Sequence, residues 1–312
     1  MSAITSILPV RNAAQWLPRT LPAILSNLSP IDQLIVINDG STDSSLSHIK
    51  TIASGFNVRI LDGRGRGLVS SLNMGLEQAE HEWIARFDAD DFYPSDRLIH
   101  QRQQIRHDVG VIFTDYEFFL NGTTSLGVIP SPIFDFATRL SLLRSQRTAH
   151  PSVIFRKDLV AAVGGYRESE FPAEDLGLWL RLAKFTKIES SPHIGLHYNL
   201  NNNSISSRKY AEAKLKTRIM AGESLRSGLL DDFHAKEVES TLNRYSNSRL
   251  GVNRRLLHIY DLLQRDFLKY VSKSERKLII QIAIHELSKP AAIKGAAEIL
   301  VDAIQRRVAR KG

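Results

Sequence analysis

The chain of 312 residues contains no cysteine, which excludes disulfide bonds, thiol catalysis and metal sites with thiolate ligands. It has no apolar run approaching the roughly 18 residues of a membrane-spanning helix. Its start, Met1 to Val10, lacks the charged region and long apolar core of a secretion signal. Neither a Walker sequence nor a His-Glu-x-x-His helix occurs. These absences predict a soluble chain, and we expect it in the cytoplasm.

Positive charge is in excess but unevenly distributed. The formal net charge is +8 and the sequence pI is near 9.7, which favours anionic partners such as nucleotides, nucleic acid or an acidic membrane face. Residues 1–200 carry 19 basic and 21 acidic side chains, a net of −2, whereas residues 201–312 carry 22 and 12, a net of +10. The excess therefore lies in the last third, and this change marks the best candidate domain boundary.

Short apolar runs alternate with helical patterns over the first 115 residues. The predicted strands are Ile4–Val10, Leu34–Ile37, Val58–Leu61 and Trp83–Phe87, and the predicted helices are Leu17–Leu28, Ser41–Ile52 and Leu68–Ala79. Two prolines, Pro18 and Pro22, predict that the first helix begins late. The alternation predicts an α/β fold with a mostly parallel sheet, whose ligands bind at the carboxyl ends of the strands.

The pattern becomes mixed after residue 111. Val111–Leu120 and Ser125–Ile129 flank Asn121-Gly122 and predict a hairpin. Further strands are predicted at His150–Phe155 and Ile194–Leu200, and nearly everything after Ser207 is predicted to be helical.

Three carboxylates occur together in Asp88-Ala89-Asp90-Asp91, directly after the fourth predicted strand. Such groups repel one another unless a cation neutralises them, and Mg²⁺ takes one or two carboxylates together with substrate phosphates. The alternative is a solvated acidic loop in which an aspartate caps a helix. The position after a buried strand favours a metal that bridges the protein to a diphosphate.

Other polar clusters lie at predicted element ends. Asp39 follows the second strand, where an acid can bind a base or a ribose, although Asp-Gly turn chemistry explains it equally well. Glu174 and Asp175 open a helix whose dipole would keep a general base ionised; ordinary N-terminal charge is the alternative. The loop Gly63–Gly67 contains Arg64 and Arg66 and is either a phosphate contact or a surface turn.

Taken in order, these segments resemble family 2 glycosyltransferases with the GT-A fold. The similar segments are Ser6–Asn12, Val36–Asp43, Gly67–Asn73 with Gly75-Leu76, Ala85–Asp91, His150–Val153, Gly164–Tyr166 and Glu174–Arg181. The resemblance covers about residues 3–205. It implies a GT-A-like catalytic domain at 1–205, with a nucleotide-sugar half at 1–115 and an acceptor half at 116–205. A basic helical region at 206–312 would follow.

The resemblance also implies roles for single residues. Pro9, Val10 and Arg11 would border the base of a nucleotide-diphosphate sugar, with a UDP-sugar favoured. Asp39 would bind uracil or ribose, and Arg66 a phosphate. Asp88 and Asp90 match the DxD pair, which implies a Mn²⁺ or Mg²⁺ cofactor with Asp90 as direct ligand. Asp175 matches the general base of an inverting transfer. Acceptor or diphosphate contacts are expected from Asp91, His150, Glu174, His197 and Ser204.

The sequence departs from the family pattern in places that bear on function. Leu72 replaces a common arginine, which leaves a phosphate contact absent or taken over by Arg66. The Gln-x-x-Arg-Trp motif of processive members is absent, so we expect single additions to a glycan or lipid-linked glycan in cell-surface polysaccharide synthesis. A catalytically silent nucleotide-sugar-binding or scaffold protein is the alternative. We expect no nucleic-acid partner, because no known nucleic-acid module occurs.

The last third carries an apolar stripe followed by four cations. The stripe consists of Ile293, Ala296, Ala297, Leu300, Ala303 and Ile304, and the cations are Arg306, Arg307, Arg310 and Lys311. Packing against the rest of the protein explains the stripe. The charges fit either peripheral contact with the inner face of the cell membrane or complementation of the helix dipole.

Overall fold

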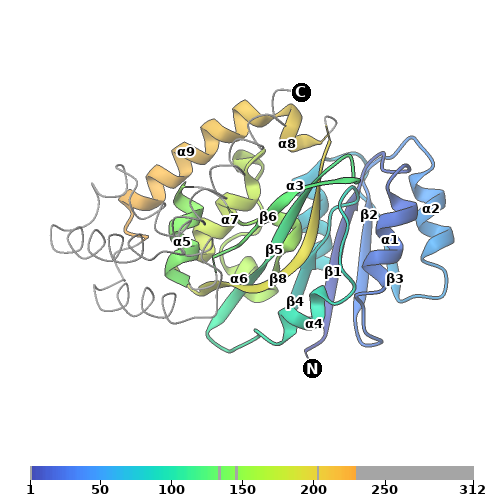
Figure 1. Ribbon diagram of the computed structural model, residues 1–312, viewed down its shortest axis with the longest axis horizontal. Coiled ribbons are helices and arrows are strands. Elements are labelled where there is room, and N and C mark those ends of the chain that lie inside the picture. Colours follow the sequence, from blue (N-terminus) through green and yellow to red (C-terminus); the bar gives the residue numbers. More distant parts are fainter. Residues whose placement is uncertain (1, 133–134, 145–146, 202–203, 230–312) are drawn as a thin grey trace.

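The computed structural model describes residues 2–132, 135–144, 147–201 and 204–229. A mixed sheet of eight strands forms its centre (Figure 1). The strands are β1 (Ile4–Val10), β2 (Gln33–Asn38), β3 (Val58–Asp62), β4 (Trp83–Arg86), β5 (Val109–Leu120), β6 (Thr124–Ile129), β7 (Ile154–Arg156) and β8 (Lys187–Leu200). Their order is β3-β2-β1-β4-β7-β5-β6, and β8 pairs with β5.

The direction of the strands changes midway across the sheet. Strands β1 to β4 are mutually parallel, as predicted for the first half of the chain. Strand β7 is antiparallel to both β4 and β5, the hairpin partner β6 is antiparallel to β5, and β8 is parallel to β5. The predicted hairpin is confirmed, with its turn at residues 121–123.

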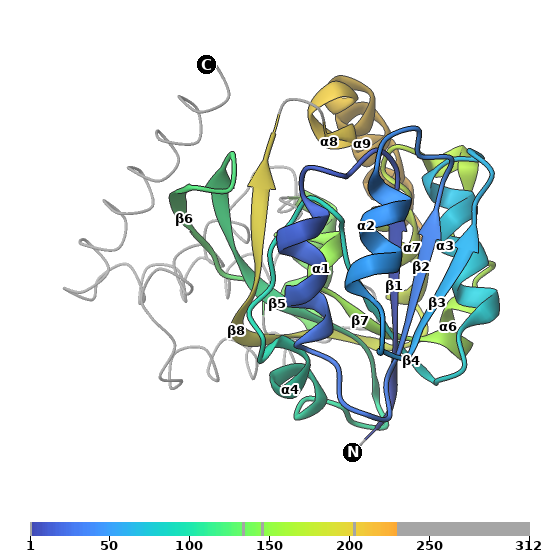
Figure 2. The ribbon, with the colours of Figure 1, turned by 90° about the vertical axis from the view of Figure 1, so that its right-hand side faces the viewer.

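Helices cover both faces of the sheet. They are α1 (Leu17–Leu25), α2 (Ser45–Ile52), α3 (Leu68–Gln78), α4 (Arg97–Arg102), α5 (Asp135–Arg144), α6 (Lys157–Ala162), α7 (Glu174–Leu182), α8 (Ile205–Arg208) and α9 (Tyr210–Arg226). Figure 2 shows α1 and α2 on one face, and α3, α6 and α7 on the other.

Strand β2 explains why both faces are covered. Leu34 and Val36 point into one apolar core, with the helices α1, α2 and α4. Ile35 and Ile37 point into the other, with α3, α6 and α7. Successive side chains of a strand alternate between faces, so a continuous apolar run needs helices on both sides.

Three sequence predictions need correction. Helix α1 begins at Leu17 rather than late, because Pro18 lies in its first turn, where no backbone donor is needed; Pro22 lies inside the helix. Helix α2 begins at Ser45 rather than near Ser41. His150 to Ser152 form a 3₁₀ turn, and the strand there is only Ile154–Arg156, because Pro151 cannot donate to a sheet ladder.

The late start of α2 has a clear cause. The side chains of Ser41, Asp43 and Ser45 accept hydrogen bonds from the backbone amides of residues 12, 14 and 13, at 3.1, 3.0 and 2.8 Å. Ser41, which was expected to begin the helix, instead ties the loop after β2 to the loop after β1 together with Asp43, and Ser45 at the start of α2 adds a third such bond.

The region after residue 205 begins with α8 and α9. Helix α9 packs against α5 and α7, and Lys216 Nζ donates to the carbonyl oxygen of Ser169 at 3.0 Å. The division into domains at 205 stays a prediction, and the predicted stripe and cations at 293–311 lie outside the described residues. Among the residues described, no helix combines the length and apolar character needed to span a bilayer.

Candidate active site

The loops after β1, β2 and β3 meet at the carboxyl edge of the sheet. Buried Asp39 accepts a hydrogen bond from the Gly67 amide at 3.1 Å, and its Oδ2 lies 3.8 Å from Arg11 Nη1. Its own amide donates to the carbonyl oxygen of Val10. The exposed Arg66 immediately precedes Gly67. The structure thus brings Arg11, Asp39 and Arg66 together, next to Pro9 and Val10.

Glycines permit this close approach. Gly40 has φ +68°, and a Cβ there would lie 3.1 Å from the Cα of Gly65. A Cβ at Gly63 would lie 3.0 Å from Asp39 Oδ1. A side chain at either position would push the two loops apart. Glycine at both positions therefore allows the loops to approach each other around Asp39.

Asp88, Asp90 and Asp91 converge after β4. One carboxylate oxygen from each lies within 4.8 Å of the others. Buried Asp91 accepts a hydrogen bond from the backbone amide of Asn199 at 2.7 Å. Asp90 Oδ2 accepts one from the side-chain amide Nδ2 of Asn201 at 2.8 Å. The end of β8 therefore holds the acidic cluster from across the sheet.

Burial and like charge affect how this cluster ionises. Burial, followed by the charge of Asp88, raises the pKa of Asp90 to about 6. Burial and the charges of Asp90 and Asp88 raise the pKa of Asp91 well above its usual value. A bound divalent cation would offset this repulsion, and carboxylate oxygens are ligands that Mg²⁺ and Mn²⁺ prefer. The residues present therefore fit such a metal.

Arg86 lies at the centre of the site. Its side chain is 2% exposed, and Nη2 lies 2.6 Å from Asp88 Oδ1. Burial lowers the pKa of Arg86, but the charge and hydrogen bond of Asp88 act together with Tyr93 and Tyr166 to raise it, and the net shift is upward. Nε and Nη1 are buried and have no hydrogen-bond partner among the described residues. A buried cation with two unused donors is suited to interact with a further anion or polar ligand.

Glu174 and Asp175 open α7, as predicted. Burial, and then the charge of Asp175, raises the pKa of Glu174 to about 7. Burial also raises the pKa of Asp175. Two effects oppose this rise and lower the pKa: the Leu176 amide donates a hydrogen bond to Asp175 Oδ1 at 2.7 Å, and Arg86 contributes a positive charge. Asp88 interacts electrostatically with both acids. The predicted base and the predicted DxD pair thus share one electrostatic site around Arg86.

Two further parts of the predicted motifs position α7. Gly177 lies against the Glu170 carboxylate, where any Cβ would clash, and Arg181 pairs with the same carboxylate. Asn73 Nδ2 donates to the carbonyl oxygen of Tyr166, and the Tyr166 amide donates to Asn73 Oδ1. These contacts hold α3, the glycine turn before Tyr166 and the segment that leads to α7 in fixed relation.

The remaining predicted contacts lie in different surroundings. His150 is buried, with Nε2 2.8 Å from the Tyr166 hydroxyl. Burial and the charge of Arg86 lower its pKa well below the usual value, so this imidazole is neutral. Ser204 caps α8 and donates to the carbonyl oxygen of Asn201, which joins it to the residue bound to Asp90. His197 instead packs against Phe119, with Nε2 3.7 Å from Glu117 Oε2.

The sequence analysis assigned no role to several residues of the site. Arg86 lies in the segment Ala85–Asp91 that resembles the family. Its position on a buried strand, two residues before Asp88, was the signal that could have marked it as a residue of the site. The Tyr93 hydroxyl accepts a hydrogen bond from the backbone amide of Asp88 at 2.6 Å. Asn199 and Asn201 reach the cluster only because β8 pairs with β5 and its end lies beside the loop after β4. No local pattern marks such distant partners.

The comparisons with known proteins agree with this geometry. A family model described as glycosyl transferase family 2 matches residues 5–160, which is half of the chain. The chain belongs to glycosyl transferase family 2.

Two curated relatives match by sequence. A UDP-Gal:alpha-D-GlcNAc-diphosphoundecaprenol beta-1,3-galactosyltransferase of Escherichia coli is 29% identical over 180 residues, 55% of this chain and 64% of the relative. A poly-beta-1,6-N-acetyl-D-glucosamine synthase of Staphylococcus aureus is 25% identical over 193 residues, 58% of this chain and 46% of the relative. The chain thus matches only about half to two thirds of their lengths.

Solved structures confirm the GT-A-like fold. S. aureus TarS 1-349 in complex with UDP-GlcNAc superposes with a TM-score of 0.60 at 17% identity, covering 94% of this chain and 89% of that one. The mannosyltransferase PcManGT from Pyrobaculum calidifontis, in complex with GDP-Man and Mn²⁺, gives a TM-score of 0.53 at 14% identity, covering 91% and 87%.

Proposed function

We propose that this protein is an inverting, metal-dependent glycosyltransferase that moves one sugar at a time from a UDP-sugar to an acceptor hydroxyl. The observation that carries the proposal is the gathering of Asp39, the three-aspartate cluster and Asp175 at one edge of the sheet. Membership of glycosyl transferase family 2 supports it.

The nucleotide would bind across the loops that meet at Asp39. Pro9, Val10 and Arg11 would border the base, Asp39 would accept hydrogen bonds from uracil or ribose, and Arg66 would contact a phosphate. The carboxyl ends of parallel strands are the usual ligand site of such sheets. TarS, a fold neighbour, was solved in complex with UDP-GlcNAc.

Asp88 and Asp90 would hold Mn²⁺ or Mg²⁺, with Asn201 positioning Asp90 and Asn199 positioning the neighbouring Asp91. When bound, the metal would supply electrostatic stabilisation to the departing diphosphate. The positive charge of Arg86 lowers the pKa of Asp90 and so helps to keep this ligand ionised. The Mn²⁺ in the PcManGT complex supports a divalent metal in this fold.

Asp175 would act as the general base. Its carboxylate would take the proton of the acceptor hydroxyl while the oxygen bonds to the anomeric carbon, opposite the breaking bond to the diphosphate. Attack from the opposite face inverts the configuration. The raised pKa of Asp175 makes it a stronger base at neutral pH than an exposed aspartate. Glu174, with a pKa of about 7, would contact the acceptor. His150, His197 and Ser204 are further residues that we propose as contacts of the acceptor or the diphosphate.

The acceptor would be a glycan or a lipid-linked glycan in cell-surface polysaccharide synthesis. The E. coli relative is named for a diphosphoundecaprenol-linked sugar, and the S. aureus relative for a polysaccharide. The basic region from residue 206 would bring a cytoplasmic enzyme to the inner face of the membrane, where a lipid-linked acceptor lies.

A donor screen followed by a transfer assay tests this function. UDP-sugars and GDP-sugars are compared by thermal shift with Mn²⁺ or Mg²⁺, since a ligand bound to the native state raises its stability. The best donor is then assayed for transfer and hydrolysis with and without chelator. Turnover that chelator abolishes supports the proposal. Donor binding without turnover on a range of lipid-linked and glycan acceptors would instead indicate a silent binding protein.

A further inference from the structure

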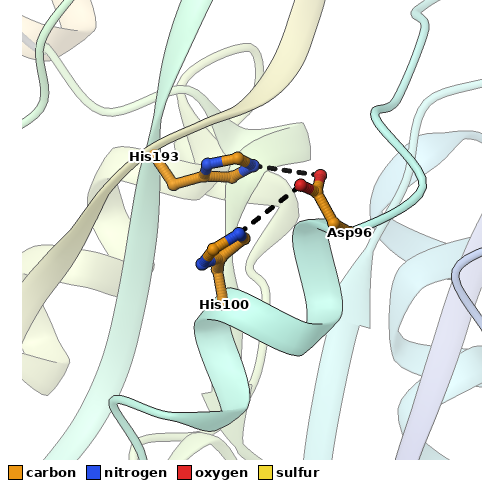
Figure 3. A group of neighbouring side chains, drawn as sticks. All are labelled: Asp96, His100 and His193. Carbon is orange, nitrogen blue, oxygen red and sulfur yellow. Dashed lines mark hydrogen bonds and ion pairs between the residues drawn. The ribbon is translucent and has the colours of Figure 1, made fainter.

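A second group of metal-binding residue types lies away from the proposed active site. Asp96 precedes α4, His100 lies one turn further along, and His193 projects from β8 (Figure 3). One ligand atom from each residue lies within 4.8 Å of the others. Two elements nearly a hundred residues apart in sequence therefore aim three side chains at one point.

The two distances to Asp96 match those between ligands of one metal ion. His193 Nε2 lies 3.0 Å from Asp96 Oδ1, and His100 Nε2 lies 3.4 Å from Asp96 Oδ2. Nitrogen and oxygen ligands bonded to a metal at about 2.0–2.2 Å are themselves about 3.0–3.5 Å apart. The two imidazole rings stack with centroids 3.9 Å apart and planes at 26°, and both Nε2 atoms lie against the Asp96 carboxylate.

The position of Asp96 adds a second observation. As the residue before a helix, it would ordinarily accept a hydrogen bond from a backbone amide of the first turn. Its side chain makes no such bond and turns instead toward the two histidines, as Figure 3 shows.

We propose that Asp96, His100 and His193 form a binding site for a transition-metal dication of zinc-like chemistry. Two imidazoles and one carboxylate suit Zn²⁺, Co²⁺ or Ni²⁺ better than Mg²⁺ or Ca²⁺, which prefer oxygen ligands alone. All three side chains are partly exposed, at 47%, 38% and 28%, so an ion can enter from solvent and keep water as its remaining ligands. The bound ion would clamp α4 to β8.

This site is separate from the acidic cluster. Helix α4 lies at the end of the sheet opposite α8 in both ribbon views, whereas the acidic cluster is held by Asn201, just before α8. Strand β8 connects them, because Asn199 binds Asp91 six residues beyond His193. The inference therefore does not depend on the proposed transferase activity.

Zn²⁺ binding to the full-length chain tests the proposal. The host is the D88N/D90N variant, which removes the competing acidic site, and the readouts are Zn²⁺ affinity by calorimetry and visible absorption of bound Co²⁺. We expect one Zn²⁺ at this site, with affinity at least about tenfold weaker after His193→Ala or His100→Ala, since even outer-shell changes cost ten- to hundredfold. His107→Ala, a change at an exposed histidine on the loop after α4, should retain the host affinity.

A chemical measurement on the unmodified chain guards against misfolded variants. Zn²⁺ should protect His100 and His193, but not His107, from diethyl pyrocarbonate, read by mass spectrometry. Equal modification of all three with and without Zn²⁺ would overturn the proposal. So would a D88N/D90N host that binds Zn²⁺ no more tightly than its His193→Ala derivative.

Discussion

In the part of the chain that the structure describes, two clusters of metal-binding residue types shift the pKa of aspartate in opposite directions. At Asp90, burial and a neighbouring carboxylate raise the pKa to about 6. At Asp96, the raising effect of burial is outweighed by the hydrogen bond and charge of His193, and the pKa is lowered. One cluster gains from a hard cation that relieves its repulsion, whereas the other already carries an ionised carboxylate between two imidazoles. Surroundings, rather than the presence of aspartate, decide which ion each would hold.

The largest expected effect separates the proposed active site around Arg86 from the Asp96 cluster. Asp175→Asn should lower kcat for transfer by about 10³-fold, within the range of general-base contributions, and should leave donor KM nearly unchanged. Asp96→Asn is the matched control and should retain activity. Initial rates with a saturating UDP-sugar and acceptor measure both. Full activity in Asp175→Asn would remove the assigned base.

The next effect compares two metal ligands directly. Asp90→Asn should reduce transfer about 100-fold and raise the Mn²⁺ concentration needed for half activity, because the diphosphate loses electrostatic stabilisation. Asp96→Asn should leave the Mn²⁺ requirement unchanged and weaken Zn²⁺ binding instead. If both variants change the same metal response, the two clusters are not independent.

A smaller effect concerns the charge of Arg86. Since this charge lowers the pKa of both Glu174 and Asp175, Arg86→Met should move the acidic limb of the pH–rate profile upward by about one pH unit. Activity near the limb would fall about tenfold. Arg86→Lys keeps the charge and should move the limb less. An unshifted profile in Arg86→Met would show that Arg86 does not set the ionisation of the base.

The smallest effect is on stability. Glu174 has an ordinary pKa of 4.5 and a folded pKa of about 7. Between these values the native state binds more protons than the unfolded state, so stability falls as pH rises from 4.5 through 7 and then levels off. Urea unfolding with chelator at pH 5 and pH 8 should show this loss. Glu174→Gln should reduce it by about 1–2 kcal/mol, whereas Glu212→Gln, an exposed change on α9, should not.

Much of the arrangement at the carboxyl edge of the sheet follows from local sequence patterns. The β-branched run before Asp39 and the apolar run before Asp88 predict strands, and parallel strands bring their carboxyl ends to one edge. Glycines at 40 and 63 and the acidic opening of α7 are also local signals. For this reason, the sequence patterns predicted that Asp39, Asp88 and Asp90 share one edge of the sheet, whereas Asp175 was assigned to the same site only through the resemblance to the family.

Other features depend on pairings between distant segments. Asn199 and Asn201 reach Asp91 and Asp90 only through the alignment of β8 with β5, and His193 meets Asp96 and His100 through the packing of α4 on β8. Local propensity acts over a few residues, whereas these contacts join residues about a hundred positions apart. The sequence alone thus determined that aspartates gather at the carboxyl edge of the sheet. Only the tertiary structure decided that Asn199 and Asn201 hold these aspartates, that the buried charge of Arg86 lies among them, and where a second set of metal-binding residues assembles.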